Sequence, residues 1–154
     1  MREILFRAKR KGCISENVYR SEYKNNDWVF GLITKQYSKE FWGRLNDEMT
    51  DIHGINGIEI DRNTVGQYTG LKDKNGKKIF EGDIVRYEFK DSDGQEESKD
   101  YLVQWDREQA GFCISLPGNY FEDGLSGMEY FEVVGNVYKN PELAKQFDSV
   151  RKGI

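Results

Sequence analysis

The stretch TVGQYTGLKDKNGKKIFEGDIV, residues 64–85, holds two turn signals on either side of a short apolar run, Ile79-Phe80. Asn75-Gly76 supplies two residues that tolerate a positive φ, as tight hairpins require, and Glu81-Gly82-Asp83 marks a second turn. Because glycine and asparagine stand where turns need them, the stretch is predicted to shape a β framework rather than to bind a ligand. Three residues in it are candidate contacts with a partner or a second copy of the chain: Gln67, Tyr68 and Leu71.

The residues that follow this stretch predict a series of short strands. Residues 84–90 alternate, with Val85, Tyr87 and Phe89 facing inward and Ile84 on the opposite side. Residues 91–100 contain no apolar side chain and predict a solvated loop. Further strands are expected at residues 101–105, 111–117 and 130–138, the last with a bulge at Gly135, and residues 118–128 read as a glycine-rich loop.

The N-terminal half predicts strands at residues 4–8, 28–34, 41–42 and 57–60, with turns at residues 25–27 and between Gly54 and Gly57. Segment 38–56 has no assigned role. One helix is expected at residues 141–152, with Asn140 as N-cap and Pro141 in the first turn. Its apolar stripe at i, i+4 and i+7 would dock on the β body: Leu143, Phe147 and Val150.

Together these elements predict a mainly β protein with a single domain, residues 1–154. Within it we expect a β-rich N-terminal lobe over residues 1–70, an SH3-like β-barrel lobe over residues 76–140, and the C-terminal helix. Gly-Asp-x-Val at residues 82–85, followed by a strand that ends in Trp105, is typical of such a barrel, although several small barrels share the pattern.

Composition indicates a small core under a charged surface: 37% of the 154 residues are hydrophobic and 32% are charged. No apolar run is long enough for a signal peptide or a membrane span, so we expect a cytoplasmic protein with no membrane partner. The net charge is −4, but residues 1–24 carry seven Lys/Arg and three Glu, a net +4 that leaves −8 on the remainder. A basic segment on an acidic body can attract phosphate or dock on an acidic surface.

No residue pattern predicts a catalytic, metal or cofactor site. Cys13 and Cys113 lie far apart, without C-x-x-C spacing, and read as free buried thiols. His53 is expected in a loop, and because it is the single histidine, the sequence predicts neither a catalytic triad nor a histidine-rich metal site. An EF-hand alignment that sets Gly76 or Gly94 at loop position 6 puts an apolar residue at position 1, so it fails.

Aromatic residues make up 14% of the chain, and two interpretations of them stay open. Trp28, Trp42 and Trp105 each fall in or beside a predicted strand, which favours packing in a core or an interface. Exposed base stacking on a β face is the alternative, with four basic residues as candidate nucleic-acid contacts: Arg7, Lys9, Arg10 and Lys11.

Several segments, in order, resemble the YopX family of bacteriophage and prophage proteins. The central stretch at residues 64–85 is similar to the family signature, MREILFRAKR to its opening, NNDWVFGLI to its Asn-Gly-x-Trp-Val-x-Gly motif, and YFEVVGNVYKNPEL to its closing motif. The departures are Ala8 in place of a glycine, Asn26-Asp27 in place of Asn-Gly, and residues 41–55, which do not align. The resemblance implies a mostly β protein encoded by a phage or prophage of a bacterial host, and it implies no reaction and no catalytic residues.

Three functional hypotheses follow. The first is a non-enzymatic interaction module in the bacterial cytoplasm that binds a phage or host protein and self-associates through exposed β edges. The second is a nucleic-acid-binding protein that uses the basic segment at residues 2–24. The third is an enzyme built on scattered carboxylates, which the absence of a catalytic motif disfavours.

Overall fold

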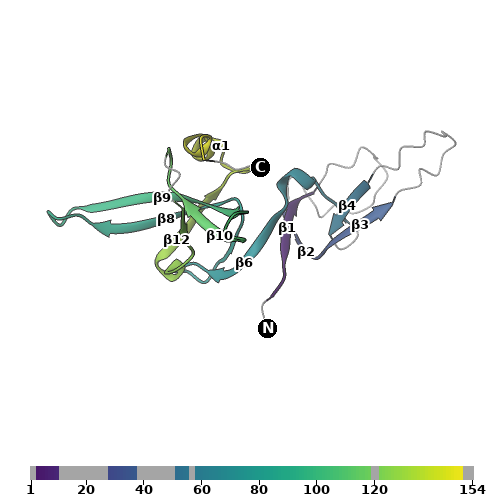
Figure 1. The fold of residues 1–154 in the computed structure, drawn as a ribbon, viewed down its shortest axis with the longest axis horizontal. Helices are drawn as coiled ribbons and strands as arrows, with labels where there is room; N and C mark the ends of the chain where they lie inside the picture. Colours follow the sequence, from purple (N-terminus) through teal and green to yellow (C-terminus); the bar gives the residue numbers. More distant parts are fainter. Residues whose placement is uncertain (1–2, 11–27, 38–50, 56–57, 119–121, 151–154) are drawn as a thin grey trace, which may run out of the picture. The chain divides into compact units, whose positions relative to one another are not determined.

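The computed structural model of the chain describes residues 3–10, 28–37, 51–55, 58–118 and 122–150. It divides into two compact units: Ile4–Gly66, the N-terminal unit, and Gln67–Ile154 with Met1–Glu3, the C-terminal unit. Antiparallel strands dominate both units (Figure 1), which confirms the mainly β class. The predictions for Cys13, Trp42, the turn at residues 25–27 and the strand at residues 41–42 lie outside the described residues.

Two small sheets form the N-terminal unit. In one, β1 (Phe6–Lys9) pairs antiparallel with β2 (Trp28–Gly31). The other has the order β3-β4-β5 and is followed by a short 3-10 helix, with these bounds: β3 (Ile33–Tyr37), β4 (Asp51–Ile55), β5 (Ile58–Glu59) and η1 (Arg62–Thr64). Ala8, Ile55 and Ile60 form the buried core of this unit.

Two sequence predictions for the N-terminal unit were wrong. The single strand at residues 28–34 is two strands with different partners, separated by Leu32, whose side chain is 60% exposed. The loop around His53 is strand β4, in which His53 lies opposite Lys35 of β3. Gly54 pairs with Glu59 of β5, and the turn predicted around Asn56 lies outside the described residues. The prediction failed because residues 51–55 lack apolar alternation, while backbone pairing with β3 holds them in a strand.

The C-terminal unit is built around a five-stranded antiparallel sheet with the order β11-β10-β9-β8-β12. Its strands are β8 (Asp83–Lys90), β9 (Glu96–Asp106), β10 (Gly111–Ser115), β11 (Glu122–Gly124) and β12 (Phe131–Asn136). A hairpin of β6 (Gly66–Lys72) and β7 (Lys78–Phe80) precedes the sheet. A 3-10 turn, η2 (Met128–Tyr130), leads into β12.

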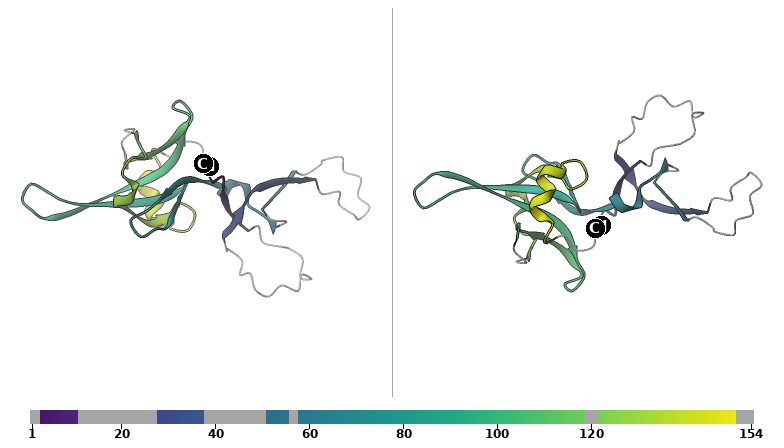
Figure 2. Two further views of the ribbon diagram at one scale, coloured as in Figure 1. Left: turned by 90° about the horizontal axis from the view of Figure 1, so that it is seen from below. Right: turned by 90° about the horizontal axis from the view of Figure 1, so that it is seen from above.

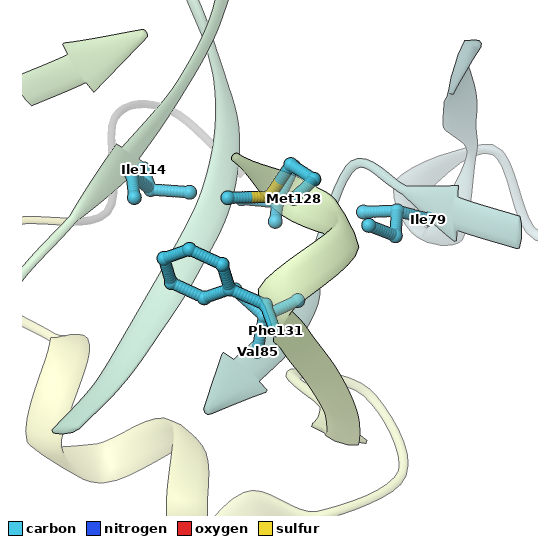
Figure 3. Close-up of a cluster of buried hydrophobic side chains, with 6 residues drawn as sticks. Ile79, Val85, Ile114, Met128 and Phe131 are labelled. Carbon is cyan, nitrogen blue, oxygen red and sulfur yellow. The ribbon is translucent and has the colours of Figure 1, made fainter. Parts of the chain in front are cut away.

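Each face of the five-stranded sheet carries its own core. Figure 3 shows the first core, where Ile79 of β7 and Met128 of η2 converge on sheet residues Val85, Ile114 and Phe131. On the opposite face, α1 (Pro141–Ala144) and η3 (Lys145–Phe147) pack over the sheet (Figure 2). There, Phe147 and Val150 are buried with three residues of the sheet and the chain after it: Ile84, Leu102 and Val137.

These two cores correct the expected alternation of β8. Ile84 was predicted to face outward, yet it is fully buried, because the C-terminal helical segment covers the second face. The apolar stripe of that segment is confirmed at Phe147 and Val150. The segment itself is shorter than predicted: regular α-helix ends at Ala144 and continues as 3-10 helix to Phe147. Asn140 does not cap it through its side chain; its Oδ1 accepts the backbone N–H of Asn136 instead, at 3.1 Å.

Two predicted loops contain strands. Residues 91–100 are not a loop throughout, because β9 begins at Glu96 and only residues 91–95 turn. Within residues 118–128, β11 pairs with β10 and places Asp123 opposite Ile114. The bulge near Gly135 is confirmed by a shift in the β12–β8 register between Val133 and Gly135, and the predicted burial of Cys113 is confirmed. Closure into an SH3-like barrel stays a prediction.

Candidate interaction surface

The first turn of the 64–85 stretch is a closed hydrogen-bonded unit. Oδ1 of Asp73 accepts the backbone N–H groups of Asn75 (2.8 Å) and Lys77 (2.9 Å), and Gly76 has φ +79°. Oδ2 of Asp73 accepts the N–H of Val133, 60 residues away, at 3.0 Å. Burial raises the pKa of Asp73, but the three N–H donors together outweigh it, so the pKa lies below the ordinary 3.8. The turn therefore fixes the β6–β7 hairpin to β12.

The second turn is equally structural. Gly82, at φ +83°, donates its N–H to Val103 (2.8 Å) and accepts the N–H of Val137 (3.0 Å). Asp83 is 1% exposed; its carboxylate accepts the N–H of Phe80 (2.8 Å) and the side-chain amide of Asn136 (3.1 Å). Both turns thus bind parts of the chain to one another, as the sequence predicted.

The three candidate partner contacts have different environments. Tyr68 is 4% exposed; its ring packs against Phe80 with 5.4 Å between centroids, and Nζ of Lys78 lies 5.0 Å from its centre. Gln67 is half-buried, and its carbonyl accepts the N–H of Glu81. Leu71 is 38% exposed, so it is the residue of the three that offers apolar surface.

The candidate nucleic-acid contacts lie in and beside β1. Arg7 and Lys9 share one face of the β1–β2 pair with Phe30 and Trp28, which stand opposite them in register. The guanidinium of Arg7 lies 4.7 Å from the centre of the Trp28 ring, and the residue is 7% exposed. Arg10 is half-buried and forms a β-bridge with Ile60, while Lys11 lies outside the described residues.

A different feature stands out in the C-terminal unit: the ends of β8 and β9 run on past the sheet as a two-stranded ribbon (Figure 1). Pairing of β8 with β12 ends at Tyr87, and pairing of β9 with β10 begins at Leu102. Beyond these points, β8 and β9 pair with each other as far as Lys90 and Glu96. We call residues 86–100 the ribbon. In the part of the chain that the structure describes, no strand pairs with the outer edge of residues 96–101.

One face of the ribbon continues the aromatic side chains of the first core. The rings of Tyr87 and Phe89 stack with centroids 6.0 Å apart and an interplanar angle of 14°. Tyr87 and Tyr101 in turn contact Phe131, at 5.1 and 5.6 Å between centroids. Nζ of Lys99 lies 5.4 Å from the centre of Phe89. The ribbon is therefore anchored to the core through a chain of half-buried rings.

The other face of the ribbon is charged. Nε and Nη2 of Arg86 donate to the two carboxylate oxygens of Asp100 at 2.7 and 3.0 Å, which raises the pKa of Arg86. Lys74, from the first turn, binds Glu88 (3.0 Å) and Glu132 (2.9 Å), and these bonds raise its pKa. The ribbon contains six Asp/Glu and three Lys/Arg, a net charge of −3.

Near the tip, the ribbon borders a shallow open hollow lined by residues of both strands: Glu88, Phe89, Lys90, Glu96, Glu97 and Ser98. Glu96 and Glu97 are exposed and form no ion pair with the described residues. Within the same ranges, no three His, Cys, Asp or Glu side chains converge as a metal site. Charged side chains therefore dominate the lining of the hollow: Glu88, Lys90, Glu96 and Glu97.

Sequence reasoning missed this surface because residues 96–100 read as solvated loop. A run of charged and polar residues at 96–100, after an Asp-Ser-Asp-Gly turn, is compatible with a strand exposed on both faces. The usable signal was the repeat of the first turn: Asp91 accepts N–H groups from Asp93 (2.9 Å) and Gln95 (2.8 Å), as Asp73 does from Asn75 and Lys77. A second hairpin with the same turn chemistry could have been inferred.

Comparison with known proteins gives a family and solved structures of similar fold. The family model described as "YopX protein" matches residues 6–145. Protein EF1440 from Enterococcus faecalis, whose crystal structure is known, is similar over 92% of this chain and 97% of its own, with 21% identity and a TM-score of 0.50; that likeness concerns the fold alone. No curated protein matches. In the described residues, no helix has the length and apolar character needed to cross a membrane.

Proposed function

The chain belongs to the YopX family, and we propose that it acts as a non-enzymatic protein-interaction module of a phage or prophage, working in the cytoplasm of the bacterial host. The observation that carries this proposal is the ribbon, in which two strands leave the sheet and their outer backbone edges pair with no other strand of the described residues. Such edges are templates for pairing with another chain, and many proteins cover or shorten them. Here β9 keeps an open edge of six residues, about 20 Å at about 3.4 Å per residue.

The ribbon is preformed, which favours its use in recognition. An isolated two-stranded hairpin is marginal in water, yet the ribbon has five cross-strand pairs, the bidentate Arg86–Asp100 ion pair and the ring contacts to Phe131. The conformational entropy of the hairpin is therefore lost on folding, before a partner binds, and preorganisation of this kind strengthens binding. The partner would be a phage or host protein.

Site-specific photo-crosslinking in the bacterial host tests the proposal. A photoreactive residue at Ser98, on the ribbon, is expected to give a discrete adduct, and the same residue at Lys145, exposed on the helical segment, is the matched control. The captured protein is then purified and the complex reconstituted from the two pure components. Equal adducts at both positions, or failure of the pure components to associate, would contradict the proposal.

A shortened ribbon supplies a second test. Deleting Glu88, Phe89, Glu97 and Ser98 removes two cross-strand pairs and two residues from each strand. An even number of residues keeps every remaining side chain on its own face, and the Asp91–Gln95 turn stays intact. The variant is expected to keep the wild-type circular dichroism spectrum and to lose partner binding. Retained binding by the folded variant would place the contact elsewhere.

Self-association is part of the same proposal, through exposed apolar surface of β6 rather than through the charged edge of residues 96–101. Light scattering over a concentration series measures it directly. Leu71, exposed at 38%, offers apolar surface for such a contact, and Leu71→Ser is expected to lower the association constant. A strict monomer at the highest concentration removes this part and leaves the heterologous contact standing.

Nucleic-acid binding is a second candidate, supported by the cluster of Arg7, Lys9, Trp28 and Phe30 on one face of β1–β2. Phe30 is 48% exposed and could stack on a base. Binding would weaken steeply with salt because phosphate contacts release counterions. A labelled single-stranded oligonucleotide that shows no anisotropy change at low salt would dismiss this candidate.

A further inference from the structure

The ribbon also limits what its partner can be. We infer that the partner is an extended segment rich in lysine or arginine that adds as a strand to the outer edge of residues 96–101 of β9; this inference rests on the proposed function. The open edge is the first requirement for strand addition, and it is met where pairing with β10 stops at Leu102. The edge of β8 is shorter, since only residues 88–90 lie beyond its pairing with β12.

Charge sets the chemistry of the segment. Residues 96–101 carry three acidic side chains and one lysine, a net charge of −2. Asp100 is already held by Arg86, whereas Glu96 and Glu97 are exposed and form no ion pair with the described part of the chain. Successive strand residues point to opposite faces, so Glu96 and Glu97 present a carboxylate on each face of the ribbon. A basic segment laid along the edge would meet both.

The aromatic face adds a second contact for such a segment. Tyr87 and Phe89 are half-buried and stacked, and one of the chain's own cations, Lys99, already lies 5.4 Å from the Phe89 ring. Long basic side chains lay their apolar stems on such rings while the charge stays near water. This contact geometry within the chain is what an incoming lysine or arginine on the same face would repeat.

The same charges disfavour a second copy at this edge. In an antiparallel pairing of residues 96–101 with themselves in full overlap, Glu97 faces Asp100 of the other copy, and the two edges together carry a net charge of −4. Like charges directly opposite one another destabilise strand pairs. The edge thus discourages its own copy and favours a basic partner, which combines an attractive with a repulsive element of specificity.

Fluorescence anisotropy with the purified full chain tests the inference. The probe is a labelled, capped heptapeptide that alternates arginine and valine, and two control peptides accompany it: one with glutamate for arginine, and one with every backbone nitrogen methylated. The first probe is expected to bind. The acidic peptide is expected not to bind, and methylation, which removes the backbone donors but keeps the charge, to weaken binding about tenfold.

Charge-reversal variants localise the contact. Glu96→Lys with Glu97→Lys is expected to weaken the arginine–valine probe at least about tenfold. Glu108→Lys with Glu129→Lys changes the net charge equally at exposed positions off the ribbon and is expected to change binding less than about twofold. On probe binding, outward amides within residues 96–101 should gain protection from hydrogen exchange.

Several results would overturn the inference. Equal binding of the methylated peptide would reduce the contact to charge alone, and equal effects of the two charge-reversal pairs would place it off the edge. A homodimer that shields the 96–101 amides would identify a second copy as the occupant. If the peptide and charge-reversal results contradict the inference while the Ser98 crosslink persists, the ribbon still binds a partner of other chemistry. If the crosslink is absent too, the proposed function fails as well.

Discussion

Asp73 offers the sharpest test of how the 64–85 stretch works. Replacing it with asparagine keeps a carbonyl oxygen that can accept the N–H groups of Asn75 and Lys77, but turns an amide N–H₂ toward the N–H of Val133. Two donors then face each other where a carboxylate oxygen had accepted a hydrogen bond at 3.0 Å. Because Asp73 is 5% exposed, water cannot readily replace the lost acceptor.

The magnitude follows from the hydrogen bonds. A hydrogen bond to a charged group contributes about 1.5–3 kcal/mol, so losing the one to Val133 is expected to lower the free energy of unfolding by about 2 kcal/mol. Asp91→Asn is the matched control, because Asp91 occupies the same turn position and accepts from Asp93 and Gln95 through Oδ1 alone. In Asp91→Asn the amide oxygen can still accept both N–H groups, so the free energy of unfolding is expected to fall by about 0.5 kcal/mol or less.

Urea unfolding at neutral pH, followed by circular dichroism, measures both variants, and amide hydrogen exchange at Val133 gives the local readout. Losses that agree within about 0.5 kcal/mol would refute the role of the Val133 anchor. The pH dependence is a second check. Since the pKa of Asp73 is lowered in the fold, its stabilisation is present above its unfolded pKa of about 3.9 and is lost as pH falls through the folded value. Below pH 4, wild type should lose stability more steeply than Asp73→Asn.

Three further predictions concern the same unit. Gly82→Ala is expected to lower the free energy of unfolding by about 2–3 kcal/mol, because φ is +83° and the new Cβ would lie 3.3 Å from the Tyr138 ring. Gly94→Ala is the control: φ is +78° but the space is open, so the same urea assay should show a loss of about 1 kcal/mol. Burial raises the pKa of Glu81 above 4.5, although hydrogen bonds from Gln67 and Trp105 lower it. The contribution of Glu81 to stability is therefore present below its unfolded pKa and is lost as pH rises through the folded pKa. Glu81→Gln should remove this fall in stability, and a pH profile identical to that of wild type would contradict the prediction. Phe147→Ala, at 0% exposure, should lower the free energy of unfolding by about 3–5 kcal/mol, with the exposed Gln146→Ala as control.

Local turn chemistry and alternation were enough to predict much of the β framework from the sequence. Asn75-Gly76, Gly82-Asp83 and Gly135 each lie where a turn or bulge was expected. The errors arose where pairing, not side-chain polarity, decides the structure. Neither the segment around His53 nor residues 96–100 show apolar alternation, yet pairing with neighbouring strands holds both backbones in β conformation. Ile84 was misplaced because the helical segment that buries it lies some 60 residues later in the chain.

The candidate surface was harder to predict for a related reason. Gln67, Tyr68 and Leu71 were chosen because they lie within the 64–85 stretch, but Tyr68 serves the chain's own packing. Arg7 was chosen for its charge, and the structure holds it against Trp28. Whether a residue is available to a partner depends on its contacts with distant segments of the chain. Composition and spacing do not reveal those contacts.

The two Asp-x-x-Gly turns make the distinction concrete. Residues 73–77 and 91–95 close in the same way, each with an aspartate that accepts two N–H groups. In the first turn the second carboxylate oxygen reaches Val133, so the turn becomes part of the framework. The second turn has no such anchor among the described residues and carries the ribbon outward. A surface that binds through strand edges needs no residue motif, because the backbone supplies the donors and acceptors, and charges such as Glu96 and Glu97 only select the partner. Under the proposed function, the most recognisable stretch of this sequence is scaffold, and the proposed binding surface lies in a segment that the sequence predicted to be a loop.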